Sequence, residues 1–447
     1  MAQIFPFHAY RYNPERVEFS RVLTQPYDKI TPEMQKRYYA LDPHNLVRIE
    51  KGEVLAGDSP AGNVYTRAAR TLEEWISTGI LLREAEPAIY VYGQEYAVPG
   101  GKQHKVRKGF IALSKLEDYA AGVVFRHELT HSGPKADRLE LLRHTRAHTG
   151  QLFMLYPDRE ARLDEHLRRI STGPAAVDFA DEFGVTHRLW PVREAGIIGQ
   201  FVRAMAREKL IIADGHHRYE TALAYRDECR AKGATAADAA HERVMMTFFS
   251  ARSEGLTLLP THRILGGFAG FNFREFRNAL DPYFDWYAYP FSGNGDRAAA
   301  EAEFCRDLAL RGRPEQSKRR AIGVYAGGGA YYLFVLRQDA HLDTLLAGVP
   351  AAQRALDVVI LHGVMLQEGL GITAEAVERE QNIRYEREMQ EGLAAVDRGD
   401  AQMACLLNPV SVEQVCELAL AGQVLPQKST DFYPKLLSGM AIQLLEE

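Results

Sequence analysis

The chain has 447 residues, with 46% hydrophobic and 25% charged side chains, which is the composition of an ordinary globular protein large enough for more than one domain. Its net charge of −5 and pI near 6.3 argue against a dedicated nucleic-acid binder, which usually has excess basic residues. No apolar run is long enough to span a membrane, no signal peptide is apparent, and the four cysteines indicate neither a disulfide framework nor a thiolate metal site. We therefore expect a cytoplasmic protein.

Predicted helices and strands are mixed from the N-terminus onward. Thr31-Pro32-Glu33 is typical of a helix start, and residues 65–79 form a second predicted helix. Alternating runs at 88–92 and 106–113, joined by Pro99-Gly100-Gly101, predict a hairpin. Further strands are predicted at 149–156, 185–192, 244–249 and 255–259, and an amphipathic helix at 193–207.

After about residue 265 the pattern changes. Helices are predicted at 273–280, 296–310, 351–368 and 410–420, and a hairpin at 321–325 and 331–336. Because strict βαβ alternation is missing, an α+β fold is favoured over a doubly wound one. We expect three domains: residues 1–265, an α+β insertion with a hairpin at 266–345, and a helical region with a rigid tail at 346–447.

The stretch from Leu210 to Tyr225 carries the strongest functional signal. Leu210–Ala213 predicts a buried strand, Gly215 ends it, and Tyr219–Arg226 has the composition of a helix. The polar residues between them are Asp214, His216, His217 and Arg218. A helix N-terminus attracts anions, and guanidinium and imidazole groups add charge-assisted donors. The stretch predicts a phosphate-binding turn, the alternative being a tight turn whose histidines cap or pack.

A second polar segment contains His127-Glu128-X-X-His131, the pattern of zinc proteases. That mechanism needs a continuous helix, whereas residues 122–125 predict a strand and Gly133-Pro134 disfavours a helix. We expect instead a polar loop, with a helix from about Asp137. The loop's Glu128 and Lys135, with Asp137 and Arg138, suit phosphoryl transfer, although a solvated loop fits equally.

Three more segments present polar groups on turns: Tyr27 and Asp28, then His262 and Arg263, then Lys428, Ser429 and Thr430 between Pro426 and Pro434. Each suits an anion or substrate contact. A strand end at 262–263 and a docking tail at 428–430 are the structural alternatives. A glycosidase acid pair, a Gly-X-Ser-X-Gly elbow and a Walker loop are absent from the sequence.

Together these motifs resemble a bacterial and archaeal family, domain of unknown function 1015, over nearly the whole chain. The matching pieces are Phe5-Pro6-Phe7, Pro26-Tyr27-Asp28, His127-Glu128-X-Thr130, Lys135-X-Asp137-Arg138, Asp214-Gly215-His216-His217-Arg218, Leu259-Pro260-Thr261-His262-Arg263, Asn408-Pro409, Pro426-X-Lys428-Ser429-Thr430 and Tyr433-Pro434-Lys435. The turn at 214–218 also resembles the phosphate motif of the ParB/sulfiredoxin fold, which archaeal free-serine kinases use. The resemblance implies an α+β, ParB/sulfiredoxin-like core.

The function implied is nucleotide-dependent phosphoryl transfer to a small hydroxyl substrate, with free L-serine as the leading candidate and ATP or ADP with Mg²⁺ as cofactors. The phosphate-binding residues would be Gly215, His216, His217, Arg218, His262 and Arg263. The catalytic residues would be Asp214, Glu128, Lys135, Asp137 and Arg138, with Asp214 or Glu128 accepting the proton or holding magnesium. The substrate contacts would be Tyr27, Asp28, Lys428, Ser429 and Thr430.

Two other function classes stay open. One is a metal-dependent hydrolase that uses some of His127, His131, His216 and His217. The other is a nucleotide-responsive regulatory module without catalysis. The sequence favours neither a membrane nor a nucleic acid as a partner, and it is compatible with a homodimer.

Overall fold

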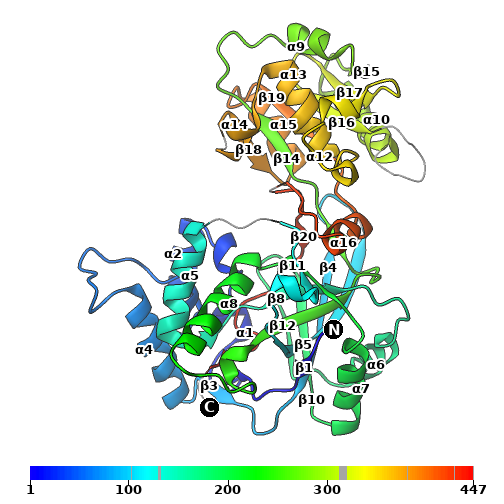
Figure 1. Ribbon diagram of the computed structural model, residues 1–447. Helices are drawn as coiled ribbons and strands as arrows, with labels where there is room; N and C mark the ends of the chain where they lie inside the picture. The colour runs from blue at the N-terminus through cyan, green and yellow to red at the C-terminus, as the bar shows by residue number, and fades with distance from the viewer. Residues whose placement is uncertain (102, 129–131, 312–319, 380, 427, 446–447) are drawn as a thin grey trace. The chain divides into compact units, whose positions relative to one another are not determined.

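The computed structural model describes residues 1–447 except 102, 129–131, 312–319, 380, 427 and 446–447. Its chain forms two compact units, and each combines helices with β-sheets, so the expected α+β class is confirmed (Figure 1). The first unit comprises Met1–Thr257, Ala419–Val424 and Phe432–Glu447, and the second comprises Leu258–Leu418 and Leu425–Asp431. The division into three domains stays a prediction.

A mixed sheet organises the first unit. Its strand order is β6-β11-β8-β12-β5-β4-β10-β9, with β1 beside β5. The strands are β1 (Ile4–Phe5), β4 (Ile89–Ala97), β5 (His104–Lys115), β6 (Val124–Phe125), β8 (Leu152–Tyr156), β9 (Val177–Ala180), β10 (Thr186–Val192), β11 (Leu210–Asp214) and β12 (Arg243–Ser250). The antiparallel pair β4/β5 is the predicted hairpin, whereas β12/β8 and β11/β6 are parallel. Strand β8 is buried throughout, as expected of a strand covered on both faces.

Helices and small sheets surround this sheet. The helical segments are α1 (Phe19–Val22), η1 (Tyr27–Lys29), α2 (Pro32–Leu41), α3 (Val47–Glu50), α4 (Val64–Ser77), η2 (Tyr119–Ala121), α5 (Ser132–Thr145), α6 (Asp164–Ile170), α7 (Ala195–Met205), α8 (His216–Ala231) and η3 (Ala240–Glu242). The remaining strands are β2 (Tyr10–Tyr12), which pairs with β3 (Leu81–Arg83), β7 (Ala147–His148), which pairs with β21 (Gln443–Leu444), β13 (Thr257–Leu258) and β20 (Phe432–Tyr433).

Local signals explain several of these boundaries. The Thr31 hydroxyl accepts from the backbone N–H of Met34 and Pro32 occupies the first turn, as predicted for α2. The apolar stripe of α7 buries Phe201, whose ring lies edge-on to Phe110 at 4.9 Å between centroids. Aromatic pairs of this kind anchor helices on sheets.

The predicted loop before Asp137 is wrong from Ser132 onward, because α5 begins there. Pro134 falls in the first turn of the helix, where a missing N–H costs nothing. Lys135, Asp137 and Arg138 are therefore helical residues. Helix α5 packs against both α4 and α8.

The second unit has its own sheet, with the order β15-β17-β16-β19-β14-β18. Its strands are β14 (His262–Leu265), β15 (Phe284–Pro290), β16 (Ala321–Tyr325), β17 (Ala330–Leu336), β18 (Ile383–Glu386) and β19 (Met403–Leu406). The helical segments are α9 (Phe273–Leu280), α10 (Asn294–Arg311), α11 (Leu342–Leu345), η4 (Ala351–Gln353), α12 (Asp357–Ile360), the π-helical η5 (Leu361–Leu366), α13 (Gln367–Leu370), α14 (Ala374–Glu378), α15 (Met389–Asp397) and α16 (Val412–Leu420). The predicted hairpin is β16/β17.

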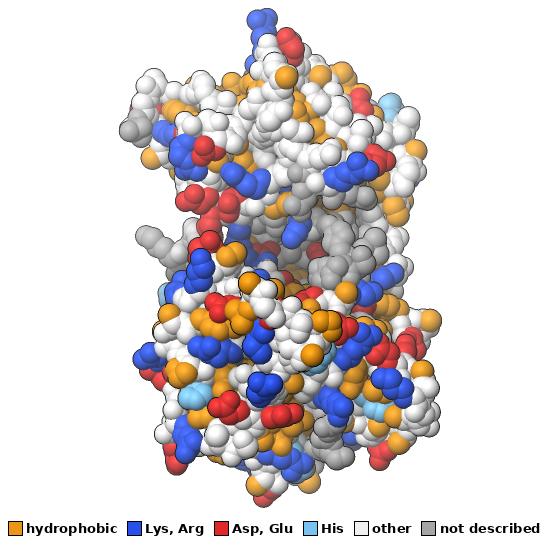
Figure 2. All heavy atoms as spheres, turned by 90° about the vertical axis from the view of Figure 1, so that its left-hand side faces the viewer, with side chains coloured by type: hydrophobic (Ala, Val, Ile, Leu, Met, Phe, Trp, Pro, Cys, Tyr) orange, Lys and Arg blue, Asp and Glu red, His pale blue; other side chains and the backbone are white. Residues whose placement is uncertain are grey.

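The start of the apolar helix predicted at 351–368 is wrong, although α12, η5 and α13 follow one another without a break from Asp357 to Leu370. Leu356 has an extended backbone, so α12 begins only at Asp357, after the separate turn η4. In the part of the chain that the structure describes, no helix combines the length and apolar character needed to cross a membrane. On the face of the first unit that carries α2, α4 and α5, basic and acidic side chains are interspersed rather than segregated (Figure 2).

Candidate functional site

The predicted turn joins β11 to α8 in the first unit. Strand β11 ends at Asp214, and Gly215 has a left-handed backbone with a φ of 95°. A Cβ at Gly215 would lie 2.9 Å from Cδ2 of Leu152 and 3.1 Å from Nε of Arg218. Both the conformation and the close approach therefore require glycine. The first turn of α8, with its unpaired N–H groups, follows the carboxylate directly.

Asp214 is held between two cations. Nη2 of Arg218 lies 3.1 Å from Oδ2, and Nζ of Lys435 lies 3.5 Å from Oδ1. Burial opposes ionisation of the carboxyl, but the charges of Lys435, Arg218 and Lys29 outweigh it and hold the pKa of Asp214 well below its usual range. Asp214 is consequently a carboxylate throughout the physiological pH range.

Arg218 also contacts the neighbouring backbone. Its Nη1 donates to the carbonyl oxygen of Gln151, whereas its buried Nε has no hydrogen-bond partner among the described residues. A buried guanidinium nitrogen without an acceptor is costly. The side chain therefore retains donor capacity beside the turn.

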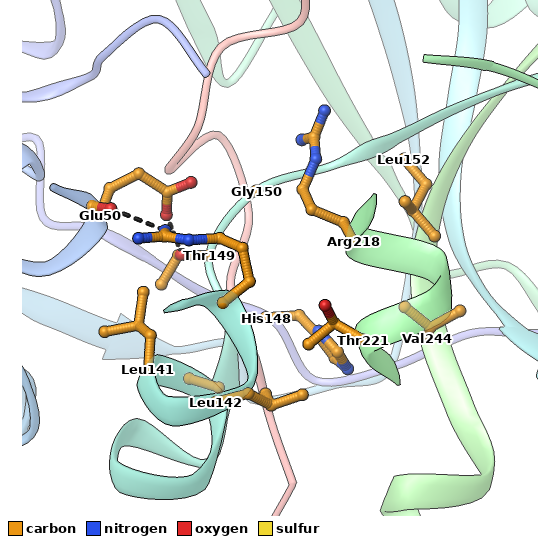
Figure 3. A pocket seen from close by; sticks show the side chains of 12 residues that line it. Glu50, Leu141, Leu142, His148, Thr149, Gly150, Leu152, Arg218, Thr221 and Val244 are labelled. Carbon is orange, nitrogen blue, oxygen red and sulfur yellow. Dashed lines mark hydrogen bonds between the residues drawn. The ribbon is translucent and has the colours of Figure 1, made fainter. Parts of the chain in front are cut away.

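Gly150 lies between Arg218 and the buried carboxylate of Glu50 (Figure 3). Glu50 is 2% exposed and accepts hydrogen bonds from the hydroxyls of Thr149 and Ser438. Its backbone carbonyl accepts from Nη1 of Arg138 at 2.8 Å. These groups adjoin a cavity of about 50 Å³ between α5 and α8, which is far below the few hundred Å³ of a typical ligand pocket.

Arg138 connects Glu50 to Asp137 and Tyr27, two residues that the sequence predicts for the site. Its guanidinium donates to Asp137 from Nε at 2.9 Å and from Nη2 at 2.6 Å, and it lies 4.3 Å above the ring of Tyr27. Burial, with the charge of Asp28, raises the pKa of Tyr27 to about 12, so its hydroxyl stays protonated. Lys135 lies apart from this network and pairs with Glu220 on α8 at 2.7 Å.

The buried histidines of the site are neutral. His127 donates from Nδ1 to the carbonyl oxygen of Ile212 at 2.6 Å, and Nε2 of His216 accepts from the backbone N–H of His127 at 3.4 Å. Burial lowers the pKa of both imidazoles. The expectation that His216 adds a positive charge to the turn is therefore wrong, because protonation would cost both burial and an acceptor.

The predicted residues divide between the two units. The first unit holds Tyr27, Asp28, Glu128, Lys135, Asp137, Arg138, Asp214, Gly215, His216, His217 and Arg218, and the second holds His262, Arg263, Lys428, Ser429 and Thr430. His131 lies outside the described residues. Among the residues that are described, no three histidine, cysteine or acidic side chains are grouped as a metal site.

Within the second unit, the residues around Arg263 are brought together. Arg263 is 1% exposed, and its nitrogens donate to the carbonyl oxygens of Thr261 and Lys428 and to Nε2 of His362. Nδ1 of His262 accepts from the backbone N–H of Leu407 at 3.2 Å. The two side chains predicted to bind phosphate are thus occupied by internal hydrogen bonds.

Sequence reasoning missed Glu50, Thr149, Ser438 and Lys435 as members of the site. Lys435 belongs to the motif Tyr433-Pro434-Lys435 and could have been nominated from it. Glu50 ends the short helix α3 and has no local signal, because its partners come from distant parts of the chain.

Three solved structures show low similarity to the chain. A conserved hypothetical protein from Pyrococcus furiosus is 11% identical, with a TM-score of 0.34, and the match covers 75% of this chain and 95% of that one. A free serine kinase in complex with AMP is 12% identical, with a TM-score of 0.35, covering 74% and 92%. SbnI with a C-terminal truncation, from Staphylococcus aureus, is 10% identical, with a TM-score of 0.34, covering 75% and 89%.

No curated protein matches the chain in sequence. A family model, in contrast, matches residues 4–359 and so spans both the turn at Asp214 and the network around Arg138. The chain therefore belongs to the family described as Protein of unknown function (DUF1015).

Proposed function

We propose that the first unit binds the phosphate groups of a nucleotide at the turn from Asp214 to Arg218 and transfers a phosphoryl group to a small hydroxyl acceptor. The observation that carries this proposal is the pair of cations, Arg218 and Lys435, on an ionised carboxylate at the N-terminus of α8. Guanidinium and ammonium groups beside unpaired helix N–H groups are the donors that phosphate oxygens need. Free L-serine is the first acceptor to test.

The residues have different roles in this proposal. Arg218 and Lys435 would exchange part of their contact with Asp214 for phosphate oxygens, and Arg138 would stabilise the charge of the transferring group. The acceptor hydroxyl would attack phosphorus as the bond to the leaving phosphate oxygen breaks. Because its pKa is strongly lowered, Asp214 is a weak base, so we assign proton acceptance to Glu128, whose Oε1 lies 3.8 Å from Nε2 of His127.

Magnesium would accompany the nucleotide. Mg²⁺ in nucleotide sites is held by one or two carboxylates together with phosphate oxygens and water. Asp214 is ionised and lies at the end of β11, next to Gly215, so it is the carboxylate suited to this role. Bound Mg²⁺ would neutralise phosphate charge. The absence of a three-ligand cluster among the described residues is consistent with a metal that depends on the nucleotide for most of its ligands.

Thermal shifts with ATP, ADP, CTP and GTP, each with and without Mg²⁺, test the binding step. A ligand at about one hundred times its dissociation constant stabilises by about 2.7 kcal/mol, which moves the midpoint by a few degrees. We expect Arg218→Ala to lose the shift. Arg143→Ala is the matched control, because Arg143 pairs with Glu140 and Glu228 on the surface.

Transfer is then tested with labelled nucleotide and L-serine as acceptor. Label in phosphoserine, lost in Glu128→Gln, would support the full proposal. If none of the four nucleotides shifted the unfolding midpoint, nucleotide binding would be refuted. A nucleotide shift without transfer to serine or other small alcohols would refute the kinase and leave a nucleotide-responsive regulatory module.

A further inference from the structure

A second cavity of the first unit lies on β5, β4, β10 and β9, and none of the residues proposed above to bind phosphate lines it. Its volume is about 440 Å³, within the range of small-molecule pockets. The segment after α6, from Ser171 to Ala175, forms its wall.

The floor of this cavity is a row of cross-strand partners. Lys108 on β5 is opposite Gly93 on β4, Gly93 is opposite Arg188 on β10, and Arg188 is opposite Asp178 on β9. Direct partners point to the same face of a sheet, and neighbouring strands are about 4.8 Å apart. Lys108 and Arg188 therefore flank a gap about two strand spacings wide, in which Gly93 contributes no side chain.

The indole of Trp190 partly fills that gap. A Cβ at Gly93 would lie 3.2 Å from Cζ3 and 3.5 Å from Cη2 of Trp190. The indole is fixed at its other end, where Nε1 donates to the carbonyl oxygen of Gly173 at 2.9 Å. The missing side chain of Gly93 thus lets a flat aromatic surface lie between two cationic side chains.

The two cations differ in their partners. Arg188 pairs with Glu95 at 2.9 Å and with Asp178 at 3.0 Å. Lys108 donates to Oγ of Ser171 at 2.7 Å, and among the described residues no carboxylate lies within ion-pair distance of it. Burial, with the charges of Arg168 and Arg188, lowers the pKa of Lys108. An anion beside Lys108 would relieve this unfavourable environment.

We propose that this cavity binds a small aromatic carboxylate, with the carboxylate at Lys108 and the ring against Trp190. The ammonium group supplies the charged donor, and the indole with the neighbouring Pro174 supplies an apolar surface. Arg188 already pairs with Glu95 and Asp178, so it is not expected to bind a second anion. The cavity is consequently a binding site independent of the proposed phosphate turn.

The test is a titration of the full chain with benzoate, followed by tryptophan fluorescence. We expect a saturable change that is absent in Trp190→Phe, since the other two tryptophans lie elsewhere. Lys108→Met should weaken benzoate binding at least tenfold, whereas Lys115→Met, on the same strand but paired with Glu117, should leave it unchanged. Benzyl alcohol, which has the ring without the charge, should bind at least tenfold more weakly than benzoate.

Three results would overturn the proposal: no saturable benzoate response, equal binding of benzoate and benzyl alcohol, or full affinity in Lys108→Met. Gly93→Ala is a second test of the site, which applies even if Lys108→Met fails to fold. Its Cβ would displace the indole while leaving Lys108 in place, so benzoate affinity should fall and the far-ultraviolet spectrum should stay unchanged. Full affinity in a folded Gly93→Ala variant would exclude the indole as the binding surface.

Discussion

Nζ of Lys435 lies 3.5 Å from Oδ1 of Asp214, although the two residues are 221 positions apart in the chain. The C-terminal segment of the first unit thereby completes a turn whose other members are consecutive in sequence. Lys435 is also buried against this turn, with only 10% of its side chain exposed. An ammonium group held in this way can respond to a phosphate with little loss of side-chain freedom.

Replacing Lys435 by Met should weaken nucleotide binding about tenfold, which corresponds to about 1.4 kcal/mol. The variant removes one of the three cations that lower the pKa of Asp214, so the pKa of that carboxyl should also rise toward its ordinary range. Isothermal titration with the nucleotide that gives the largest thermal shift measures the affinity. Lys232→Met, at the exposed end of α8, serves as the control, and equal affinities in the two variants would contradict the role of Lys435.

Glu50→Gln should destabilise the first unit by about 1–3 kcal/mol, the usual cost of leaving buried polar groups poorly paired. The amide retains the size of the side chain but replaces one acceptor oxygen by a donor, against the hydroxyls of Thr149 and Ser438. Urea denaturation measures the loss. The exposed Glu53→Gln is the control, and an unchanged midpoint for Glu50→Gln would show that the hydroxyls simply reorient.

Gly150→Ala should lower both stability and nucleotide affinity. Its Cβ would lie 3.1 Å from Nη1 of Arg218 and 3.2 Å from both Oε1 of Glu50 and Oγ of Ser438, so these groups must separate. Overpacking of this kind costs about 1–3 kcal/mol. Gly57→Ala, where a Cβ meets nothing within 4 Å, should be neutral in the same denaturation and titration experiments. Wild-type nucleotide affinity in Gly150→Ala would show that the hydrogen bonds of Glu50 with Thr149 and Ser438 do not affect phosphate binding at the turn.

The local parts of the site could be predicted from the sequence because their signals are local. An apolar run, a glycine and a helical composition were enough to place β11, the turn at Gly215 and α8, and alternation was enough for the β4/β5 hairpin. The start of α5 is not predicted correctly because Gly133-Pro134 disfavours a helix interior, whereas proline is tolerated in the first turn of a helix.

The tertiary parts of the site could not be predicted in this way. The role of Glu50 depends on its hydrogen bonds with Thr149 and Ser438, and no periodicity relates three residues that are so widely separated in the chain. The charge of a histidine is equally inaccessible, since His216 and His262 look like cations in sequence but are buried acceptors of backbone N–H groups.

The environment of His262 predicts how stability changes with pH. Burial, with the charge of Arg263, lowers the pKa of His262 to about 4, compared with about 6.5 in an unfolded chain. The unfolded state therefore binds a proton first as the pH falls. The stability contributed by neutral His262 is complete above about pH 6.5 and is lost progressively between that value and its folded pKa.

At pH 5 this loss should reach about 2 kcal/mol for one such histidine, since each pH unit below about 6.5 costs about 1.4 kcal/mol. His262→Asn removes the titration while its Oδ1 can still accept from the backbone N–H of Leu407. Urea denaturation at pH 7.5 and pH 5 should therefore show a smaller difference in the variant than in the wild type. His166→Asn, which replaces a half-buried histidine on α6, is the control. An identical pH dependence in wild type and His262→Asn would mean that His262 binds its proton at the same pH in the folded and unfolded states, so that burial does not lower its pKa.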